Sequence, residues 1–347
     1  MTANALAVRH IIRPDESSDE WDAYVWNHPK GSIFHTFAMH RVFNATPMHQ
    51  SLAAAWRSDS GRIVAMIPAV RVETLSGVAS YIASRSIWYA EPLCDASREG
   101  QQGLANLIEW HDKQVKHGTL FSEIRPLLAA GHEKQVLQQK GFEHYDYLNF
   151  VVDVSQPEDA LWRKVSKSGR HSIRKSERRG VEVSIVDAPE AVERTYAMIT
   201  ESYKRAAVPL ASIELFKRAY ALLPEGVLCT RIATFEGRDV AAGFGLRYGD
   251  RFFAWYGGAL RVPTISPFDC LTWDEIRWCS QNGIKYYDFG GAGKPHEPYG
   301  PRIFKAKFGG DCVQYGRYQR VHAPVRYNLA SAVYKSIRQI KSVYNAQ

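Results

Sequence analysis

Two stretches of the chain, one in each half, alternate short apolar runs with turn residues in the same way. Residues 51–73 read as two strands that meet at a turn ending in Gly61, with small and β-branched side chains on both sides. Residues 228–248 repeat this pattern around Gly237, and a third apolar run, RFFAWYGGA, follows the next glycine. The pattern predicts an antiparallel meander of strands in each half.

In each half, a stretch typical of a helix follows the meander. A run of residues typical of a buried strand follows that helix. The first copy covers residues 103–126 and the second covers 270–291, with Gly118 or Gly283 between helix and strand. A glycine in this place is typical of a left-handed helix cap. Meander, helix and strand in this order match the GNAT fold of acyl-CoA N-acyltransferases. We therefore predict an α/β (α+β) protein with two tandem GNAT-like domains.

Length and composition agree with two domains. A chain of 347 residues exceeds a typical single domain, and 45% hydrophobic residues are ordinary for a globular protein. We expect an N-terminal GNAT-like domain over 1–150, a second over 151–325, and a basic amphipathic helix over 326–347. The chain has no basic start followed by an apolar stretch and no run near the roughly 18 apolar residues that span a bilayer. A cytoplasmic location is expected by default.

The net charge of +8 is concentrated in two segments. Residues 163–179 hold eight Lys or Arg and one acid, and residues 326–347 hold four Lys or Arg and no acid. In the first segment the i, i+4 spacing of a helix places three arginines on one face, suited to phosphates of a donor or of a nucleotide-linked acceptor, with a lysine beside them: Arg170, Arg174, Arg178 and Lys175. A solvated helix face explains the same pattern.

The tail carries an apolar helical stripe beside its basic residues. Such a helix suits either peripheral contact with the inner face of an anionic membrane or packing against the second domain. The five cysteines stand far apart, without the spacing of a zinc site. We expect reduced thiols, no metal and no tightly bound cofactor.

The common catalytic signatures are missing. The segment GGAGKP, residues 290–295, fails as a phosphate-binding loop because Asp288 stands where its first glycine belongs and Pro295 follows the lysine. GxSxG, HExxH and GxGxxG motifs are also absent. Neither half has the glycine-rich loop by which an acetyl-CoA enzyme binds pyrophosphate, which disfavours a simple acetyl-CoA transferase. Hydrolase, zinc peptidase and dinucleotide oxidoreductase classes therefore lose support.

The second half resembles the FemAB family in the order and spacing of four segments. These are residues 161–183, then FAWYGGA, then LTWDEIRWCSQNGIKYYDFGGAG, then PRIFKAKFGG. The resemblance implies two GNAT-like halves and transfer of amino acids from aminoacyl-tRNA onto peptidoglycan precursors. The long helical hairpin of some members is absent, as it is in exopolysaccharide-cluster branches and in BioF2-like acyltransferases, so aminoacyl-tRNA and acyl-CoA both remain candidate co-substrates.

The resemblance also implies site residues. The FK dipeptide of the family lies over the reacting centre, which points to Phe304 and to Lys305 as the partner of the oxyanion. More loosely, the family's acceptor groove corresponds to Thr36, Trp88 and Tyr89 in the first half.

Chemistry adds further candidates. Aminolysis of an activated ester needs a neutral amine, although an amine of pKa about 10.4 is only about 0.04% neutral at pH 7. Asp288 ends a predicted buried strand, where it would orient an amine or pair with a structural arginine such as Arg302. Tyr256 and Tyr287 would flank the same cleft if the strands are placed correctly, and aromatic core packing is the alternative.

The predicted function is direct aminolysis without a covalent enzyme intermediate. The enzyme would transfer an aminoacyl or acyl group to an amine of a UDP- or lipid-linked envelope precursor or of a polysaccharide intermediate. One alternative is an acyl-CoA-dependent GNAT N-acyltransferase in exopolysaccharide biosynthesis. The other is a non-catalytic GNAT-like module that binds through the basic segment. The sequence does not indicate an oligomeric state.

Overall fold

The computed structural model describes residues 10–73, 84–116, 118–206 and 208–332. The chain forms two compact units. The second consists of residues 147–314 within the described part. The first joins the residues up to Asp146 with a segment that starts at Tyr315. No helix in the described ranges is long and apolar enough to cross a membrane.

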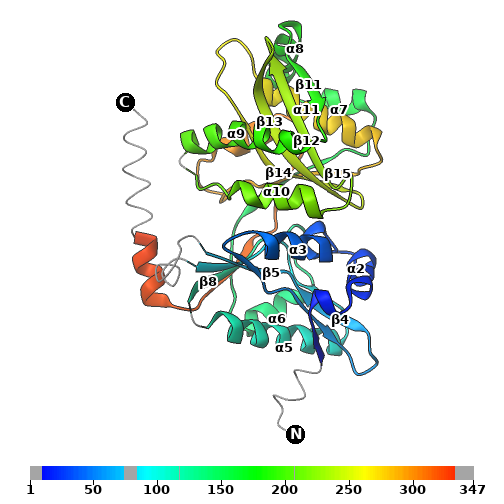
Figure 1. The fold of residues 1–347 in the computed structure, drawn as a ribbon, viewed down its shortest axis with the longest axis vertical. Coiled ribbons are helices and arrows are strands. Elements are labelled where there is room, and N and C mark those ends of the chain that lie inside the picture. Colours follow the sequence, from blue (N-terminus) through cyan, green and yellow to red (C-terminus); the bar gives the residue numbers. More distant parts are fainter. Residues whose placement is uncertain (1–9, 74–83, 117, 207, 333–347) are drawn as a thin grey trace. The chain divides into compact units, whose positions relative to one another are not determined.

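The first unit contains two sheets (Figure 1). One has the order β1-β3-β4-β7 and the other β2-β5-β6-β8-β17-β9. The strands are β1 (Ile11–Ile12), β2 (His49–Ser51), β3 (Ala54–Arg57), β4 (Ile63–Ile67), β5 (Ala69–Val72), β6 (Ser84–Trp88), β7 (Leu93–Cys94), β8 (Thr119–Ile124), β9 (Glu143–Tyr145) and β17 (Arg317–Val321). The helices are α2 (Ser18–Asn27), α3 (Phe37–Ala45), α5 (Arg98–Val115) and α6 (Glu133–Gln139), with short 3-10 turns at Pro14–Glu16 and Ile33–His35.

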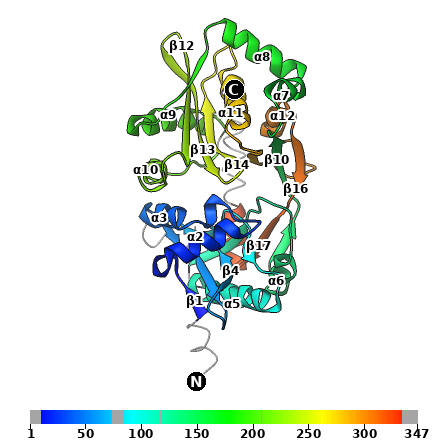
Figure 2. The ribbon, with the colours of Figure 1, turned by 90° about the vertical axis from the view of Figure 1, so that its right-hand side faces the viewer.

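The second unit is built around one sheet of order β11-β12-β13-β14-β15-β10-β16. Its strands are β10 (Leu148–Asp153), β11 (Glu182–Ile185), β12 (Leu228–Phe235), β13 (Arg238–Tyr248), β14 (Arg251–Ala259), β15 (Tyr286–Gly291) and β16 (Asp311–Gln314). Its helices are α7 (Glu158–Lys164), α8 (Lys167–Arg178), α9 (Pro189–Ala206), α10 (Ile213–Leu222), α11 (Pro267–Gln281) and α12 (Gly300–Ala306). Figure 2 shows α9 and α11 on either side of its strands.

The predicted tandem of α/β units is confirmed by the topology. The hairpins turn at Gly61 and Gly237, both with positive φ, and Gly283 follows α11 with φ 74°. In each unit a helix leads into a central strand, β8 or β15, which pairs in parallel with the last meander strand, β6 or β14. The duplication seen in the sequence is therefore a duplication of structure.

In each unit one strand is inserted between strands that are distant from it in sequence. β10 follows β9 but is inserted between β15 and β16, whereas β17 follows β16 and is inserted between β8 and β9. The expected boundary at 325 therefore differs from the structure, which assigns β17 to the first unit. Residues 324–332 continue as a helix. Most of the expected tail helix, 333–347, lies outside the described residues.

Two glycines in succession fix the layers around β14. A Cβ on Gly257 would lie 2.5 Å from the ring of Phe268 in α11, and a Cβ on Gly258 would lie 2.7 Å from the carbonyl oxygen of Met198 in α9. Successive side chains of a strand point to opposite faces. The two helices therefore cover opposite faces of β14, each in close contact with its backbone.

We expect Gly258→Ala to lower the free energy of unfolding by about 1–3 kcal/mol, because the backbone of α9 has to move away from β14. Urea unfolding followed by circular dichroism measures this change. Gly300→Ala is the matched control, since nothing lies within 4 Å of a Cβ there. Equal stability of the two variants would contradict the close approach of α9 to β14.

Candidate active site

The central strands of the second unit separate after a short pairing. β14 and β15 are in parallel register only from Arg251 opposite Tyr286 to Phe253 opposite Asp288. Beyond that point β15 stays paired with β10, while β14 stays paired with β13. The register between β13 and β14 skips Trp255, so a β-bulge lies where β14 leaves β15. The sheet therefore opens between its two central strands.

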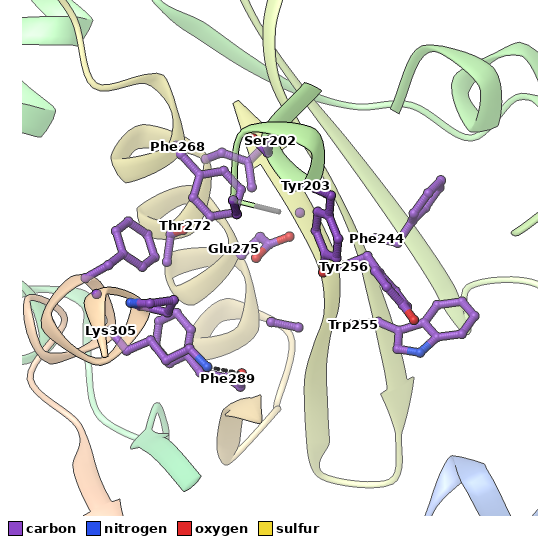
Figure 3. Close-up of a pocket in the computed structure, with 18 of the residues that line it drawn as sticks. Ser202, Tyr203, Phe244, Trp255, Tyr256, Phe268, Thr272, Glu275, Phe289 and Lys305 are labelled. Atoms are coloured by element: carbon purple, nitrogen blue, oxygen red, sulfur yellow. Dashed lines mark hydrogen bonds between the residues drawn. The ribbon is translucent and has the colours of Figure 1, made fainter. Parts of the chain in front are cut away.

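A cavity of about 450 Å³ fills this opening (Figure 3). Ser202 and Tyr203 line it from α9 on one face of the sheet, and Leu271, Thr272 and Glu275 line it from α11 on the other. Helix α12 adds Phe304 and Lys305. The remaining wall is mainly aromatic, with contributions from Phe244, Trp255, Tyr256, Phe268, Tyr287 and Phe289. The cavity thus reaches both faces of the sheet and holds one lysine and one glutamate among its lining residues.

Lys305 is positioned by the end of β15. Its Nζ donates hydrogen bonds to the carbonyl oxygens of Phe289, at 2.8 Å, and of Gly291, at 2.6 Å. Gly290 adopts φ 68°, a left-handed conformation that favours glycine. An ammonium group has three N–H donors, so these two bonds leave one for a group in the cavity. Burial lowers the pKa of Lys305 to about 8, and the nearby Asp288 opposes this shift.

Asp288 supports this arrangement from behind. Its Oδ1 accepts a hydrogen bond from the backbone N–H of Gly290 at 2.7 Å. Burial raises its pKa to about 6, against the Gly290 bond and the charges of Arg251 and Lys305. Tyr287 and Phe289 line the cavity and Asp288 does not, because alternate residues of a strand face opposite sides. Its position suits holding the turn that binds Lys305, rather than contact with a substrate.

Arg302 is not the partner of Asp288, and that expectation was wrong. Its guanidinium donates to the carbonyl oxygens of Ala292 at 2.8 Å, of Pro295 at 3.2 Å, and of Lys294. Backbone carbonyls left unpaired after β15 attract a cation with several donors. Arg302 therefore holds the 292–295 loop against α12.

Phe304, which the family resemblance indicated, and Tyr256 and Tyr287, which the strand order indicated, all line the cavity. The ring of Phe304 packs on Phe268, with centroids 5.3 Å apart, and on Phe308. Tyr287 is 1% exposed, and its hydroxyl donates to Glu275 at 2.5 Å. These aromatic rings therefore pack in the core and line the cavity at the same time.

The arginines of α8 have partners within the protein. Arg170 donates to the carbonyl oxygens of Trp162, of Arg163 at 3.0 Å, and of Val165, which end α7. Arg174 lies over the ring of Trp162 at 5.2 Å from its centroid. A surface groove is lined by these two, Arg178, Lys167, His171 and Glu177, and Lys175 is half-buried outside that group. The groove confirms that Arg170, Arg174 and Arg178 share one face of α8. The guanidinium of Arg170, however, binds the carbonyl oxygens at the end of α7.

Of the first-half candidates, Thr36 and Trp88 are buried in the first unit and Tyr89 is half-buried. Thr36 caps α3 by accepting from the N–H of Met39, Trp88 is fully buried, and Tyr89 stacks between Phe34 and Phe43. Each has a packing or capping role that accounts for its position. They remain predictions as acceptor-binding residues.

Sequence reasoning missed Glu275. It lies one helical turn from Leu271 and one turn from Cys279, on the buried stripe of α11. An acid on an otherwise apolar helix face is the signal that could have identified it. Among the described residues, no group of three His, Cys, Asp or Glu side chains is placed to hold a metal ion.

The comparisons with known proteins agree with this geometry. A family model described as an acetyltransferase (GNAT) domain matches residues 163–299. A UDP-N-acetylmuramoylpentapeptide-lysine N(6)-alanyltransferase of Weissella viridescens is 26% identical over 149 residues, 42% of this chain and 44% of that protein. The chain thus matches less than half the length of that relative.

Two solved structures share the fold of nearly the whole chain. FemX has a TM-score of 0.70 and 14% identity, over 92% of this chain and 99% of its own. L-PGS from Bacillus licheniformis has a TM-score of 0.56 and 13% identity, over 90% and 96%. The fold and the opening between β14 and β15 define a tandem GNAT protein. The chain therefore shares the tandem fold of FemX, and over part of its length it is similar in sequence to a GNAT family model and to an alanyltransferase.

Proposed function

We propose that this chain is an acyltransferase that moves an aminoacyl group from an activated ester to an amine of a cell-envelope precursor. The observation that supports it best is the Lys305 ammonium, held by two carbonyl oxygens at the wall of a cavity that opens between separated central strands. An activated carbonyl group in that cavity would meet a fixed cation. This is the arrangement that acyl transfer needs.

The reaction is a direct aminolysis. The acceptor nitrogen attacks the carbonyl carbon, a C–N bond forms, and the carbonyl electrons move to its oxygen. The remaining N–H of Lys305 stabilises that oxyanion, a contribution on the order of 10² to 10³ in rate. The intermediate then expels the alcohol or thiol of the donor, which takes up the proton lost by the amine. No bond to the enzyme forms.

The relatives suggest the substrate class. The Weissella viridescens protein is named as an alanyltransferase acting on a lysine of UDP-N-acetylmuramoylpentapeptide. By analogy the acceptor here is a UDP- or lipid-linked peptidoglycan precursor, and the donor is aminoacyl-tRNA, with acyl-CoA as the competing donor. We place this reaction in the cytoplasm, with peripheral contact at the inner face of the membrane.

A transfer assay tests the proposal. Purified protein is incubated with radiolabelled aminoacyl-tRNA or with acyl-CoA, and with UDP-N-acetylmuramoyl-pentapeptide, and the product is resolved by mass. Amide product from aminoacyl-tRNA supports the function, and product from acyl-CoA alone would shift it to N-acyl transfer. Binding of precursor without product from any donor would favour the non-catalytic module.

The pH dependence of turnover follows from the lowered pKa of Lys305, which is about 8 because of burial. The protonated form stabilises the oxyanion, so we expect turnover to fall as the pH rises through about 8. Lys305→Arg keeps its positive charge to higher pH. The fall in turnover on the alkaline side of the pH profile should then move to higher pH or disappear. A limb that stays in place in Lys305→Arg would assign it to another group.

A further inference from the structure

Glu275 directs a carboxyl group into the aromatic cavity. The residue is 4% exposed, and its Oε2 accepts the hydrogen bond of the Tyr287 hydroxyl. Figure 3 shows its side chain projecting from α11 into the space beside Tyr203 and Tyr256. Its other oxygen lies near the backbone of β13, since a Cβ on Gly243 would be 3.7 Å from Oε1. One carboxyl oxygen is thus engaged by the protein, and the other remains for a ligand.

Within the described part of the chain, this carboxylate has no ion pair of its own. The nearest cation is Arg231, whose Nε donates to Asp274 Oδ2 at 3.0 Å, and Asp274 also accepts from Arg277 at 2.7 Å. Burial raises the pKa of Glu275, while the charge of Arg231 and the Tyr287 bond oppose this shift. A carboxylate that faces an apolar space without a counter-ion is costly. A cationic ligand group would remove that cost.

The rings around Glu275 suit such a group. Tyr203 and Tyr256 line the cavity with their ring centroids 6.0 Å apart, and Tyr256 also packs on Phe216, with centroids 4.9 Å apart. Faces of aromatic rings attract an ammonium ion. Of the cavity-lining residues, Lys305 supplies the positive charge for an oxyanion and Glu275 supplies the negative charge for a cation.

An aminoacyl group carries both features that these two residues would bind. Its carbonyl oxygen becomes the oxyanion, and its α-amino group, with a pKa of about 8, is largely protonated near neutral pH. A simple acyl group has no cation and would leave Glu275 unpaired. The attacking amine of the acceptor must be neutral, so a carboxylate that stabilises its ammonium form would slow the attack.

We propose that the Glu275 carboxylate receives the α-ammonium group of the amino acid being transferred, so that the cavity selects aminoacyl over simple acyl donors. This inference rests on the proposed acyl transfer and names the donor class. Losing a hydrogen bond to a charged group typically leaves a preference of about tenfold or more between matched ligands.

The test uses stable amide analogues of the donor end that cannot react. One pair is 3′-deoxy-3′-(L-alanylamido)adenosine and its propionyl counterpart, which differ in the α-amino group alone. A second pair carries L-phenylalanyl and 3-phenylpropionyl groups. Titration calorimetry at pH 7 gives four dissociation constants for each protein. We expect at least one pair to favour the amine-bearing member by about tenfold or more.

Glu275→Gln retains the shape and an acceptor for Tyr287, and should reduce that preference to within about twofold while the propionyl analogues bind as before. Glu275→Asp keeps the charge and should retain part of the preference. Glu297→Gln, an exposed glutamate whose nearest cation is Lys294 at 3.4 Å, is the matched control. Circular dichroism confirms that each variant is folded.

The inference is overturned if no analogue binds, if both members of each pair bind equally, or if Glu275→Gln keeps the preference. Because the analogues do not react, a preference that persists without any transfer activity would reject the proposed function alone.

Discussion

Lys305→Ala should reduce turnover by about 10² to 10³ while donor binding stays within a few fold, because the lost N–H acts mainly on the developing oxyanion. The ammonium is fixed by the carbonyl oxygens of Phe289 and Gly291, so little reorganisation accompanies the reaction. Single-turnover kinetics with a saturating donor measures the chemical step directly. A fall in kcat with an unchanged KM is the expected result.

Lys294→Ala is the matched control for this variant. It removes a lysine near the same end of β15, but its Nζ is exposed and pairs only loosely with Glu297 at 3.4 Å. The backbone oxygen of Lys294 still accepts from Arg302, so the 292–295 loop is retained. Unchanged turnover in Lys305→Ala would contradict the role of Lys305. A large loss in Lys294→Ala would show that the loop, rather than the ammonium, is needed.

The local elements could be predicted because their signals are local. Gly61 and Gly237 have positive φ in tight hairpins, and the apolar runs beside them identify the strands. The insertion of β10 and β17 into sheets of different units could not be predicted, because strand pairing over such sequence distances leaves no local signal. The boundary at 325 differed for that reason.

The residues that line the cavity could be predicted in part, but the contacts of the arginines could not. The resemblance indicated Phe304 and Lys305, and the expected strand order indicated Tyr287; all three line the cavity. It could not show that Arg170 caps α7 or that Arg302 binds loop carbonyls, since both depend on which backbone oxygens lie nearby. Arginine-rich segments look alike in sequence whether they bind phosphate or helix ends.

A buried ion pair between β12 and α11 should contribute strongly to the stability of the second unit. Arg231 has a side chain that is 0% exposed, and it is paired with Asp274, whose side chain is 20% exposed. Arg231 also lies over the ring of Trp278, 4.9 Å from its centroid. We expect Asp274→Ala to lower the free energy of unfolding by about 3 kcal/mol, because it leaves a buried guanidinium without its carboxylate. Urea unfolding followed by tryptophan fluorescence measures the loss.

The double variant Arg231→Met, Asp274→Ala tests the cause of that loss. Methionine fills a similar volume without charge, and replacing a buried pair by apolar residues is often neutral. We therefore expect the double variant to regain most of the stability lost in Asp274→Ala, to within about 1 kcal/mol of the original protein. If the double variant is as unstable as Asp274→Ala, the carboxylate of Asp274 stabilises the fold mainly through its ion pair with Arg277. Recovery would show that the loss in Asp274→Ala comes from the buried charge of Arg231 left without its carboxylate.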